Sequence, residues 1–286
     1  MITEFYEDIG LFYDQVYSFL IEREAENNLF FSILNAIKLD PNIYGDQSPL
    51  LVLIKTDGQL ELVSIQTPPF KLILSYTDNL HSIDTLITSL IQKGIELPGV
   101  LGPKDLVHRF INIWSKNRNI HPKLATQERI YKLTEVSEDI LGKKKVIRST
   151  KKDHSLIINW AKDFITEAFP ESIEQHMHNF EKRLVPDIDQ GRFFLLIEDE
   201  KVVSMARKAG KTPNGNVVNF VYTPPALRRR GYATECVANL SEHILEEGNQ
   251  FCFLFTDLAN PISNSIYQKI GYKSIIDVDE YEFLLD

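Results

Sequence analysis

The pattern of hydrophobic and polar positions predicts the same order of elements in both halves of the chain: helix, helix, hairpin, strand and helix. In the first half, the predicted helices are 11–22, 26–39, 79–92 and 103–116, and the predicted strands are 50–56, 60–66, 70–76 and 128–136. Asp57-Gly58 between the first two strands is typical of a two-residue hairpin turn. The segment ELPGVLGP reads as a turn-rich connection, because glycine and proline interrupt regular structure.

The second half repeats this order. Its predicted helices are 156–168, 173–184, 233–247 and 262–269, and its predicted strands are 193–198, 202–208, 217–223 and 251–258, with a final pair of strands up to Leu285. Between the halves, the basic run GKKKVIRSTKK has no apolar periodicity and indicates a linker or an exposed edge. We therefore predict an α/β (α+β) fold with mixed, twisted sheets flanked by helices. The predicted domains are 1–125, a bridging strand and linker at 126–145, and 146–286.

Composition narrows the class of protein. The chain has 286 residues, enough for two ordinary domains, and its formal net charge of -9 argues against nucleic acid as a main partner. Cys236 and Cys252 have no CxxC spacing, so we expect reduced, buried thiols. His176 and His178 are two residues apart and would diverge on a helix, so no metal is expected. The sequence shows no leader peptide and no apolar run of about 20 residues, which predicts a cytoplasmic protein without a membrane partner.

The stretch VVNFVYTPPALRRRGYA, residues 217–233, carries the most chemical information. An apolar strand ends at two prolines, and three arginines and Gly231 lead into a helix. The first turn of that helix would present unpaired N–H groups and the positive end of its dipole toward any anion that the arginines attract. Glycine at 231 would let the backbone approach an anion where a Cβ atom would intrude.

Two spaced motifs resemble the GNAT-type N-acetyltransferases. Arg228-x-x-Gly231-x-Ala233 matches the R/Q-x-x-G-x-G/A signature of that family, and NPISNSIYQKIGY, residues 260–272, resembles its N-x-x-A-x-x-x-Y-x-x-x-G-F/Y segment. The resemblance covers about 146–286. In these segments the sequence looks most similar to bacterial predicted acetyltransferases with a degenerate first half. It is more distantly similar to glycine N-acyltransferase-like proteins. The resemblance implies tandem GNAT-like folds, the second of them catalytic.

The resemblance also implies a site for acetyl-CoA as the acyl donor. The strands 217–223 and 251–258 would splay apart, and main-chain groups of Val221, Tyr222 and Thr223 would hold the pantetheine arm like an added strand. One of these N–H groups could also polarise the thioester carbonyl. The residues that would surround the pyrophosphate are Arg228, Arg229, Arg230, Gly231, Tyr232, Ala233 and Thr234. Many relatives have glycine where this chain has Arg229.

The same resemblance assigns roles to two residues downstream. The hydroxyl of Tyr267 would protonate the departing thiolate, and Asn260 would contact the cofactor arm. Without the motif, Tyr267 would read as a tyrosine packed against the sheet and Asn260 as a helix cap, and the cap is compatible with the contact. The general base is not fixed by a motif. Asp257, Glu280 and Glu282 are candidates, and each also reads as a surface charge.

The leading prediction is an acetyl-CoA-dependent N-acetyltransferase that acts on a primary amine by direct attack in a ternary complex. The acceptor could be a small-molecule amine or a protein amine, and a homodimer is left open. The first half has no glycine- or arginine-bearing loop after its third strand, so we expect it to be a non-catalytic GNAT-like domain. The alternative is a catalytically inactive CoA-binding regulator or partner-binding protein.

Overall fold

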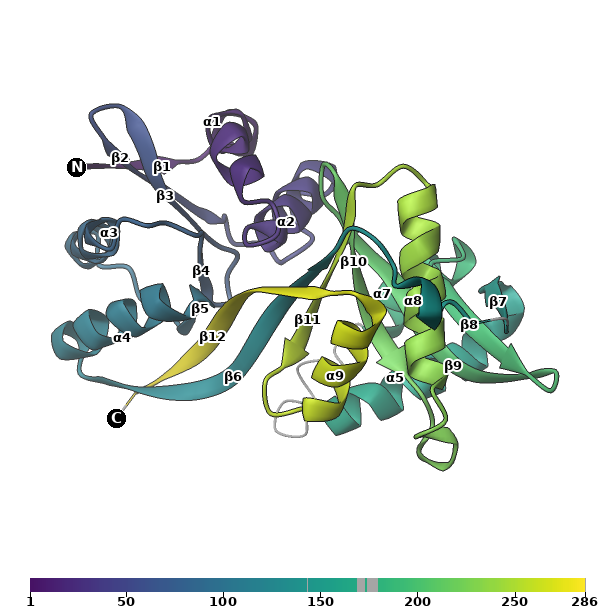
Figure 1. Cartoon of the computed structure of the whole chain (residues 1–286). Coiled ribbons are helices and arrows are strands. Elements are labelled where there is room, and N and C mark those ends of the chain that lie inside the picture. The colour runs from purple at the N-terminus through teal and green to yellow at the C-terminus, as the bar shows by residue number, and fades with distance from the viewer. Residues whose placement is uncertain (143, 169–172, 174–179, 286) are drawn as a thin grey trace. The chain divides into compact units, whose positions relative to one another are not determined.

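The structure is a computed structural model that describes residues 1–142, 144–168, 173 and 180–285 (Figure 1). The chain divides into two compact units. The first unit comprises 1–130, 256–259 and 274–286, and the second comprises 131–255 and 260–273. The last strand thus groups with the first unit, whereas the sequence prediction places 146–286 in one domain.

The first unit is a mixed sheet with helices on both faces. Its elements are β1 (Ile2–Tyr6), α1 (Ile9–Glu22), α2 (Asn28–Leu39), β2 (Leu50–Thr56), β3 (Gln59–Gln66), β4 (Leu72–Leu74), α3 (His81–Gln92), β5 (Gly99–Pro103), α4 (Lys104–Arg118), most of β6 (Ile120–Leu133) and nearly all of β12 (Lys273–Leu285). The strand order is β1-β2-β3-β4-β5-β12-β6, with β4 and β5 parallel. Helices α1 and α2 cover one face and α3 and α4 the other, each over its own apolar cluster.

The second unit has the same layered plan. Its elements are η1 (Glu138–Ile140), β7 (Lys145–Arg148), η2 (Lys151–Asp153), α5 (His154–Ala168), α7 (Phe180–Asp189), β8 (Phe193–Glu198), β9 (Lys201–Lys211), β10 (Gly215–Tyr222), η3 (Pro225–Leu227), α8 (Tyr232–Glu246), most of β11 (Phe251–Asp257) and α9 (Pro261–Ile270). The strand order is β11-β10-β9-β8-β7, in which only β10 and β11 pair in parallel. Helices α5 and α7 pack on one face through Ile157 and Leu184, and α8 packs on the other through Val237 and Leu240.

Most predicted elements are confirmed, including the mixed sheets flanked by helices. The Asp57-Gly58 hairpin has positive φ at both residues, 52° and 83°, as a two-residue turn between antiparallel strands requires. The basic run between the halves forms the edge strand β7, which agrees with the expected exposed edge. Half of the predicted helix 173–184 lies outside the described residues, as do His176 and His178, and its last five residues form the start of α7.

Three expectations from the sequence are wrong. Residues 99–103 form the inner strand β5 rather than a turn, because glycine there lets neighbouring strands approach: a Cβ on Gly102 would lie 2.9 Å from Cβ of Leu74. The end of the chain is one strand of 13 residues, β12, and not a pair. The strand expected at 128–136 begins eight residues earlier, at Ile120. β1 has no counterpart among the predicted elements.

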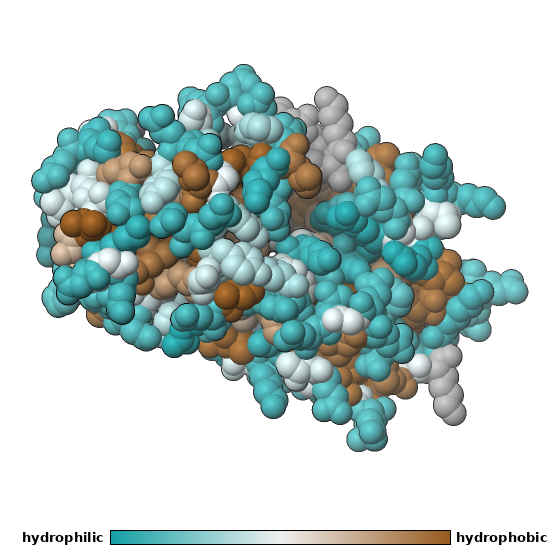
Figure 2. All heavy atoms as spheres, turned by 90° about the horizontal axis from the view of Figure 1, so that it is seen from above, coloured by the Kyte–Doolittle hydropathy of each residue, from teal (hydrophilic) through white to brown (hydrophobic). Residues whose placement is uncertain are grey.

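Figure 2 shows one face of the molecule. Hydrophilic residues cover most of this face, and apolar residues form separate, smaller groups between them. This distribution agrees with a chain in which 25% of residues are charged.

Candidate functional site: the separation of β10 and β11 and the loop into α8

The two parallel strands of the second unit separate part-way along their length. Pairing between β10 and β11 is confined to three positions, the last of which joins Val217 to Phe253. The pairing of β10 with β9 then shifts register between Asn219 and Tyr222, and Phe220 within this bulge has a left-handed φ of 47°. A bulge changes the direction of a strand and leaves one residue unpaired. Among the described residues, no strand therefore pairs with the edge of β10 toward β11 from residue 218 to Tyr222, which agrees with the separation that the resemblance implies.

An unsatisfied polar atom lies at the start of this separation. Asn219 Oδ1 is buried and accepts no hydrogen bond from the part of the chain that the structure describes. Burying an acceptor without a partner costs about 1–3 kcal/mol, so such an atom usually meets a ligand or water. The separated edge of β10 thus offers main-chain groups to a ligand, and Asn219 of the same strand carries an acceptor without a partner among the described residues.

The loop after β10 turns tightly into α8. It passes through η3, and both Arg229 and Gly231 adopt left-handed conformations, with φ of 63° and 81°. A left-handed backbone at Arg229 is a conformation that glycine adopts without the steric cost of a Cβ atom. Gly231 is the N-cap of α8, contributes no capping side chain, and a Cβ placed on it would meet nothing within 4 Å. The amides of the first turn, from Tyr232 to Thr234, therefore begin at an open surface.

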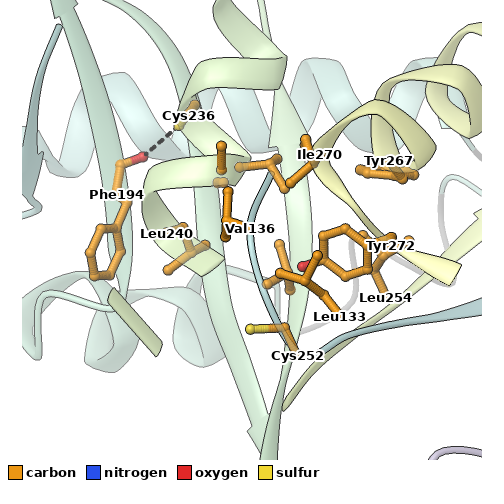
Figure 3. Close-up of a cluster of buried hydrophobic side chains, with 14 of the residues drawn as sticks. Leu133, Val136, Phe194, Cys236, Leu240, Cys252, Leu254, Tyr267, Ile270 and Tyr272 are labelled. Carbon is orange, nitrogen blue, oxygen red and sulfur yellow. Dashed lines mark hydrogen bonds between the residues drawn. The ribbon is translucent and has the colours of Figure 1, made fainter. Parts of the chain in front are cut away.

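Tyr267 lies on α9, within the cluster of buried side chains that Figure 3 shows. The residue is 8% exposed. Its ring centroid is 6.4 Å from that of Tyr131 and 6.0 Å from that of Tyr272, and all three residues belong to one cluster with Val221 and Tyr232. Burial alone raises the pKa of Tyr267 to about 12, so its hydroxyl stays protonated at neutral pH. The cluster therefore brings the predicted proton donor into the same core as the strand and the loop.

Comparison with known proteins extends these observations. Residues 197–284, which contain both motifs, match the family model described as FR47-like protein. A GNAT-family acetyltransferase from Colwellia psychrerythraea is similar at 11% identity, covering 99% of this chain and 100% of that one, with a TM-score of 0.58. A Drosophila protein aligns at 12% identity, 99% and 98% coverage and a TM-score of 0.66. A GCN5-related N-acetyltransferase from Sphaerobacter thermophilus aligns at 14% identity, 87% and 83% coverage and a TM-score of 0.53.

The chain has the GNAT fold. The resemblance to the GNAT-type N-acetyltransferases that the two motifs predict is thereby confirmed. No curated protein matches the sequence at a significant level.

Within this GNAT fold, the side chain of Arg228 holds the loop in place. Its Nε donates to the carbonyl of Thr223 at 2.8 Å, and its terminal nitrogen lies 2.9 and 2.7 Å from the two carboxylate oxygens of Glu167 on α5. Arg229 and Arg230 are exposed and have no ion pair within the described residues. Arg228 therefore supports the loop, and the other two arginines supply the positive charge that faces solvent.

Two of the residues predicted to hold the pantetheine arm by their main chain, Tyr222 and Thr223, are held in place by β9, on the other side of β10. The carbonyl of Tyr222 accepts a hydrogen bond from Ser204 Oγ at 3.1 Å, and Ser204 Oγ lies 2.9 Å from Thr223 Oγ1. The ring of Tyr222 packs beside Trp160 of α5, at 5.9 Å between centroids. Asn260 caps α9, because its Oδ1 accepts from the Ser263 amide at 3.1 Å. The capping role considered from the sequence is thus present.

The candidate general bases differ in their ion-pair and hydrogen-bond partners. Glu280 and Glu282 both bind Lys71, at 2.5 and 3.2 Å, and Asp257 accepts from the Ala259 amide at 2.7 Å. Sequence reasoning did not select Glu128 of β6. Burial, the Glu280 carboxylate and the Asp257 carboxylate raise the pKa of Glu128 to about 7. Its neighbours come from the ends of β11 and from β12, which no local sequence pattern connects.

Both cysteines are buried and free, as predicted. The thiol of Cys236 lies 3.5 Å from the Phe194 carbonyl (Figure 3), and that of Cys252 lies 3.5 Å from the Ser241 carbonyl. Burial raises the pKa of each to about 12, so neither is a nucleophile at neutral pH. Within the described ranges, no three His, Cys, Asp or Glu side chains are grouped to hold a metal ion, and no helix is long and apolar enough to span a bilayer.

Proposed function

We propose that the protein is an acetyl-CoA-dependent N-acetyltransferase that transfers an acyl group to a primary amine by direct attack in a ternary complex. The observation that carries this proposal is the separation of β10 and β11 beyond Val217, next to the uncapped start of α8. The fold itself hosts acyl transfer in solved relatives, but folds support many chemistries, so the site has to carry the argument.

The residues present fit acetyl-CoA. The unpaired edge of β10 around Val221 and the unsatisfied Oδ1 of Asn219 suit an extended arm that contains amide groups. The amides at Gly231 and the first turn of α8, with Arg229 and Arg230 beside them, suit a pyrophosphate. Acetyl-CoA supplies the acyl group as a thioester. An N–H group at the free edge of β10 would polarise the carbonyl of that group.

One residue is assigned to proton transfer. Tyr267 carries a hydroxyl that remains protonated well above neutral pH, so it can donate a proton to a departing thiolate. The general base remains open, because the candidates Asp257, Glu280 and Glu282 belong to the first unit and the gap belongs to the second.

The acceptor class follows from charge. The formal net charge of -9 favours a cationic amine over an anionic acceptor. A polyamine, an aminoglycoside or a lysine side chain has the required primary amine.

Calorimetric titration with acetyl-CoA and CoA tests the proposal. In the Gly231→Glu variant, a carboxylate would occupy and repel the anion site, so binding should be lost. Gly94→Glu is the matched control, because Gly94 also has a left-handed φ, 67°, with nothing within 4 Å of its added Cβ. We expect the wild type and Gly94→Glu to bind alike.

A folded wild type that binds neither ligand would overturn the proposal. Binding without acetyl transfer to any of the three amine classes would instead identify an inactive CoA-binding protein. The two results are distinguishable, because only the second retains sensitivity to Gly231→Glu.

A further inference from the structure

A cavity of the second unit lies away from the gap between β10 and β11. Its volume is 690 Å³, and it is formed by the end of β7, the turn before β8, the end of β9 and the two turns that precede β10 and β11. The gap opens beyond Val217 and Phe253, toward the C-terminal ends of β10 and β11, whereas this cavity lies at their N-terminal ends. A volume of this size accommodates a small-molecule ligand.

The charges that line the cavity are unbalanced. Four cations, Arg148, Arg192, Lys208 and Lys211, line it with one carboxylate, Glu247. This excess of positive charge is unusual for a chain with a formal net charge of -9. An excess of one sign in a concave surface concentrates the potential there and attracts ions of the opposite sign.

Existing pairs neutralise only part of this charge. Lys208 binds Glu247, whose other carboxylate oxygen lies 3.0 Å from His243 Nε2. Arg192 lies 3.2 Å from Asp187, which also binds Arg207. Although burial acts to raise the pKa of Glu247, Lys208, His243 and Arg148 lower it below the usual range. The local field is therefore positive even at the one lining carboxylate.

Two cations remain without a carboxylate partner among the described residues. Arg148 is held by its Nε, which donates to the Gly191 carbonyl at 3.0 Å, and its guanidinium lies 5.8 Å from the centre of the Phe194 ring. The N–H groups of its two terminal nitrogens can therefore donate hydrogen bonds to a ligand. Lys211 is exposed at the end of β9 and has no ion pair within the described chain. An oriented guanidinium with a mobile ammonium is a common pair for an anion with several oxygens.

Neutral amide residues complete the lining, namely Gln190, Asn249 and Gln250. The side chain of Asn249 donates to the Ile244 carbonyl at 2.8 Å and that of Gln250 to Asn214 Oδ1 at 3.2 Å, so both are held in place. Gly248 in the same turn has a φ of 90° and nothing within 4 Å of an added Cβ, so the turn is open to solvent. The walls thus combine positive charge with fixed polar groups.

We propose that this cavity binds a small anion with two or more negative charges, of the phosphate-ester or polycarboxylate class. The site is separate from the pyrophosphate loop at Gly231, and the proposal does not rest on the proposed acetyltransferase function.

The test uses the full chain and two probes, inorganic pyrophosphate and citrate, titrated by calorimetry at low ionic strength. The protein carries Gly231→Glu in every titration, so that the loop before α8 cannot bind the probe. The test variant adds Arg148→Gln and Lys211→Gln. The control adds Lys145→Gln and Lys201→Gln, which remove the same charge from exposed residues that do not line the cavity.

We expect the test variant to bind at least one probe about tenfold or more weakly than the parent, because each charge-assisted hydrogen bond contributes strongly to affinity. The control should change affinity less than about threefold, through long-range charge alone. Glu247→Gln should strengthen binding, because it removes the one negative charge from the lining. This gain cannot arise from misfolding.

Three results would overturn the proposal. One is the absence of binding of both probes to the parent at millimolar concentration. Another is an equal loss in the test and control variants, which would show only non-specific charge attraction. The third is unchanged or weaker binding in a folded Glu247→Gln variant.

Discussion

Replacing Tyr267 with phenylalanine tests the assigned proton donor with little disturbance of the core. The ring packs between Tyr131 and Tyr272, and phenylalanine preserves both contacts. Burial is the sole cause of the raised pKa of Tyr267, so no hydrogen bond to a described residue contributes to it. We therefore expect the free energy of unfolding to change by less than about 0.5 kcal/mol.

The catalytic effect should be much larger. With a pKa of about 12, all but about one in ten thousand of the hydroxyls are protonated at pH 8, so nearly every molecule has a competent donor. Loss of a positioned general acid typically lowers the rate by about 10²-fold or more, which corresponds to about 2.7 kcal/mol of barrier. The assay follows release of the CoA thiol with the amine that the wild type acetylates fastest.

Tyr272→Phe provides the matched control. Its hydroxyl lies 2.8 Å from Ser241 Oγ in a buried pair, so removing it should cost about 1 kcal/mol of stability and leave kcat within about twofold. Tyr267→Phe should therefore lower kcat and leave stability unchanged, whereas Tyr272→Phe should lower stability and leave kcat nearly unchanged. A Tyr267→Phe enzyme that keeps kcat within about threefold of the wild type would refute the assignment of this phenol as the acid.

Three further predictions concern other parts of the chain. Because the folded-state pKa of Glu128 is raised, its carboxyl favours folding most below about pH 4.5 and loses that contribution as pH rises through 7, so the Tm of Glu128→Gln relative to the wild type should be higher at pH 8 than at pH 5. Gly102→Ala should lower the free energy of unfolding by about 1–3 kcal/mol in a denaturant titration, since the added Cβ would lie 2.9 Å from Leu74 Cβ, and an unchanged midpoint would contradict that contact. Cys236 and Cys252 should both resist an aromatic disulfide reagent in the native protein and react fully in denaturant, whereas fast native reaction of either would contradict its burial.

The sequence predicted best where local rules decide the structure. The Asp57-Gly58 turn and the strand and helix on either side of Gly231 follow from side-chain period and from glycine, and they lie within one or two residues of their predicted bounds. The prediction of a turn at 99–103 was wrong for the same local reason. Gly99 and Gly102 are typical turn residues, but here they allow neighbouring strands to approach closely. Glycine alone does not distinguish a turn from a close approach.

The candidate functional residues likewise divide into those that the sequence predicts and those that it does not. The loop and Tyr267 lie in contiguous motifs, so the resemblance assigns them from the sequence alone. Glu128 acquires its raised pKa from burial and from Glu280 and Asp257, which lie more than 100 positions away in the sequence. Its charge state depends on how the sheet brings strands together, and a single sequence carries no local signal for that.

The two units show why the fold alone does not decide which junction can bind an anion. In the first unit, the chain between β4 and α3 supplies its own acceptors: the His81 amide donates to Asn79 Oδ1 at 3.2 Å, and the Asn79 amide donates to Thr77 Oγ1 at 3.0 Å. The charged residue in the first turn of that helix is acidic, Asp84. In the second unit, Gly231 offers no capping side chain. Arginines precede that glycine, so its helix can accept an external anion where the other is already satisfied. The difference lies in a few side chains at equivalent turns, and it explains why both CoA binding and its loss should depend on position 231.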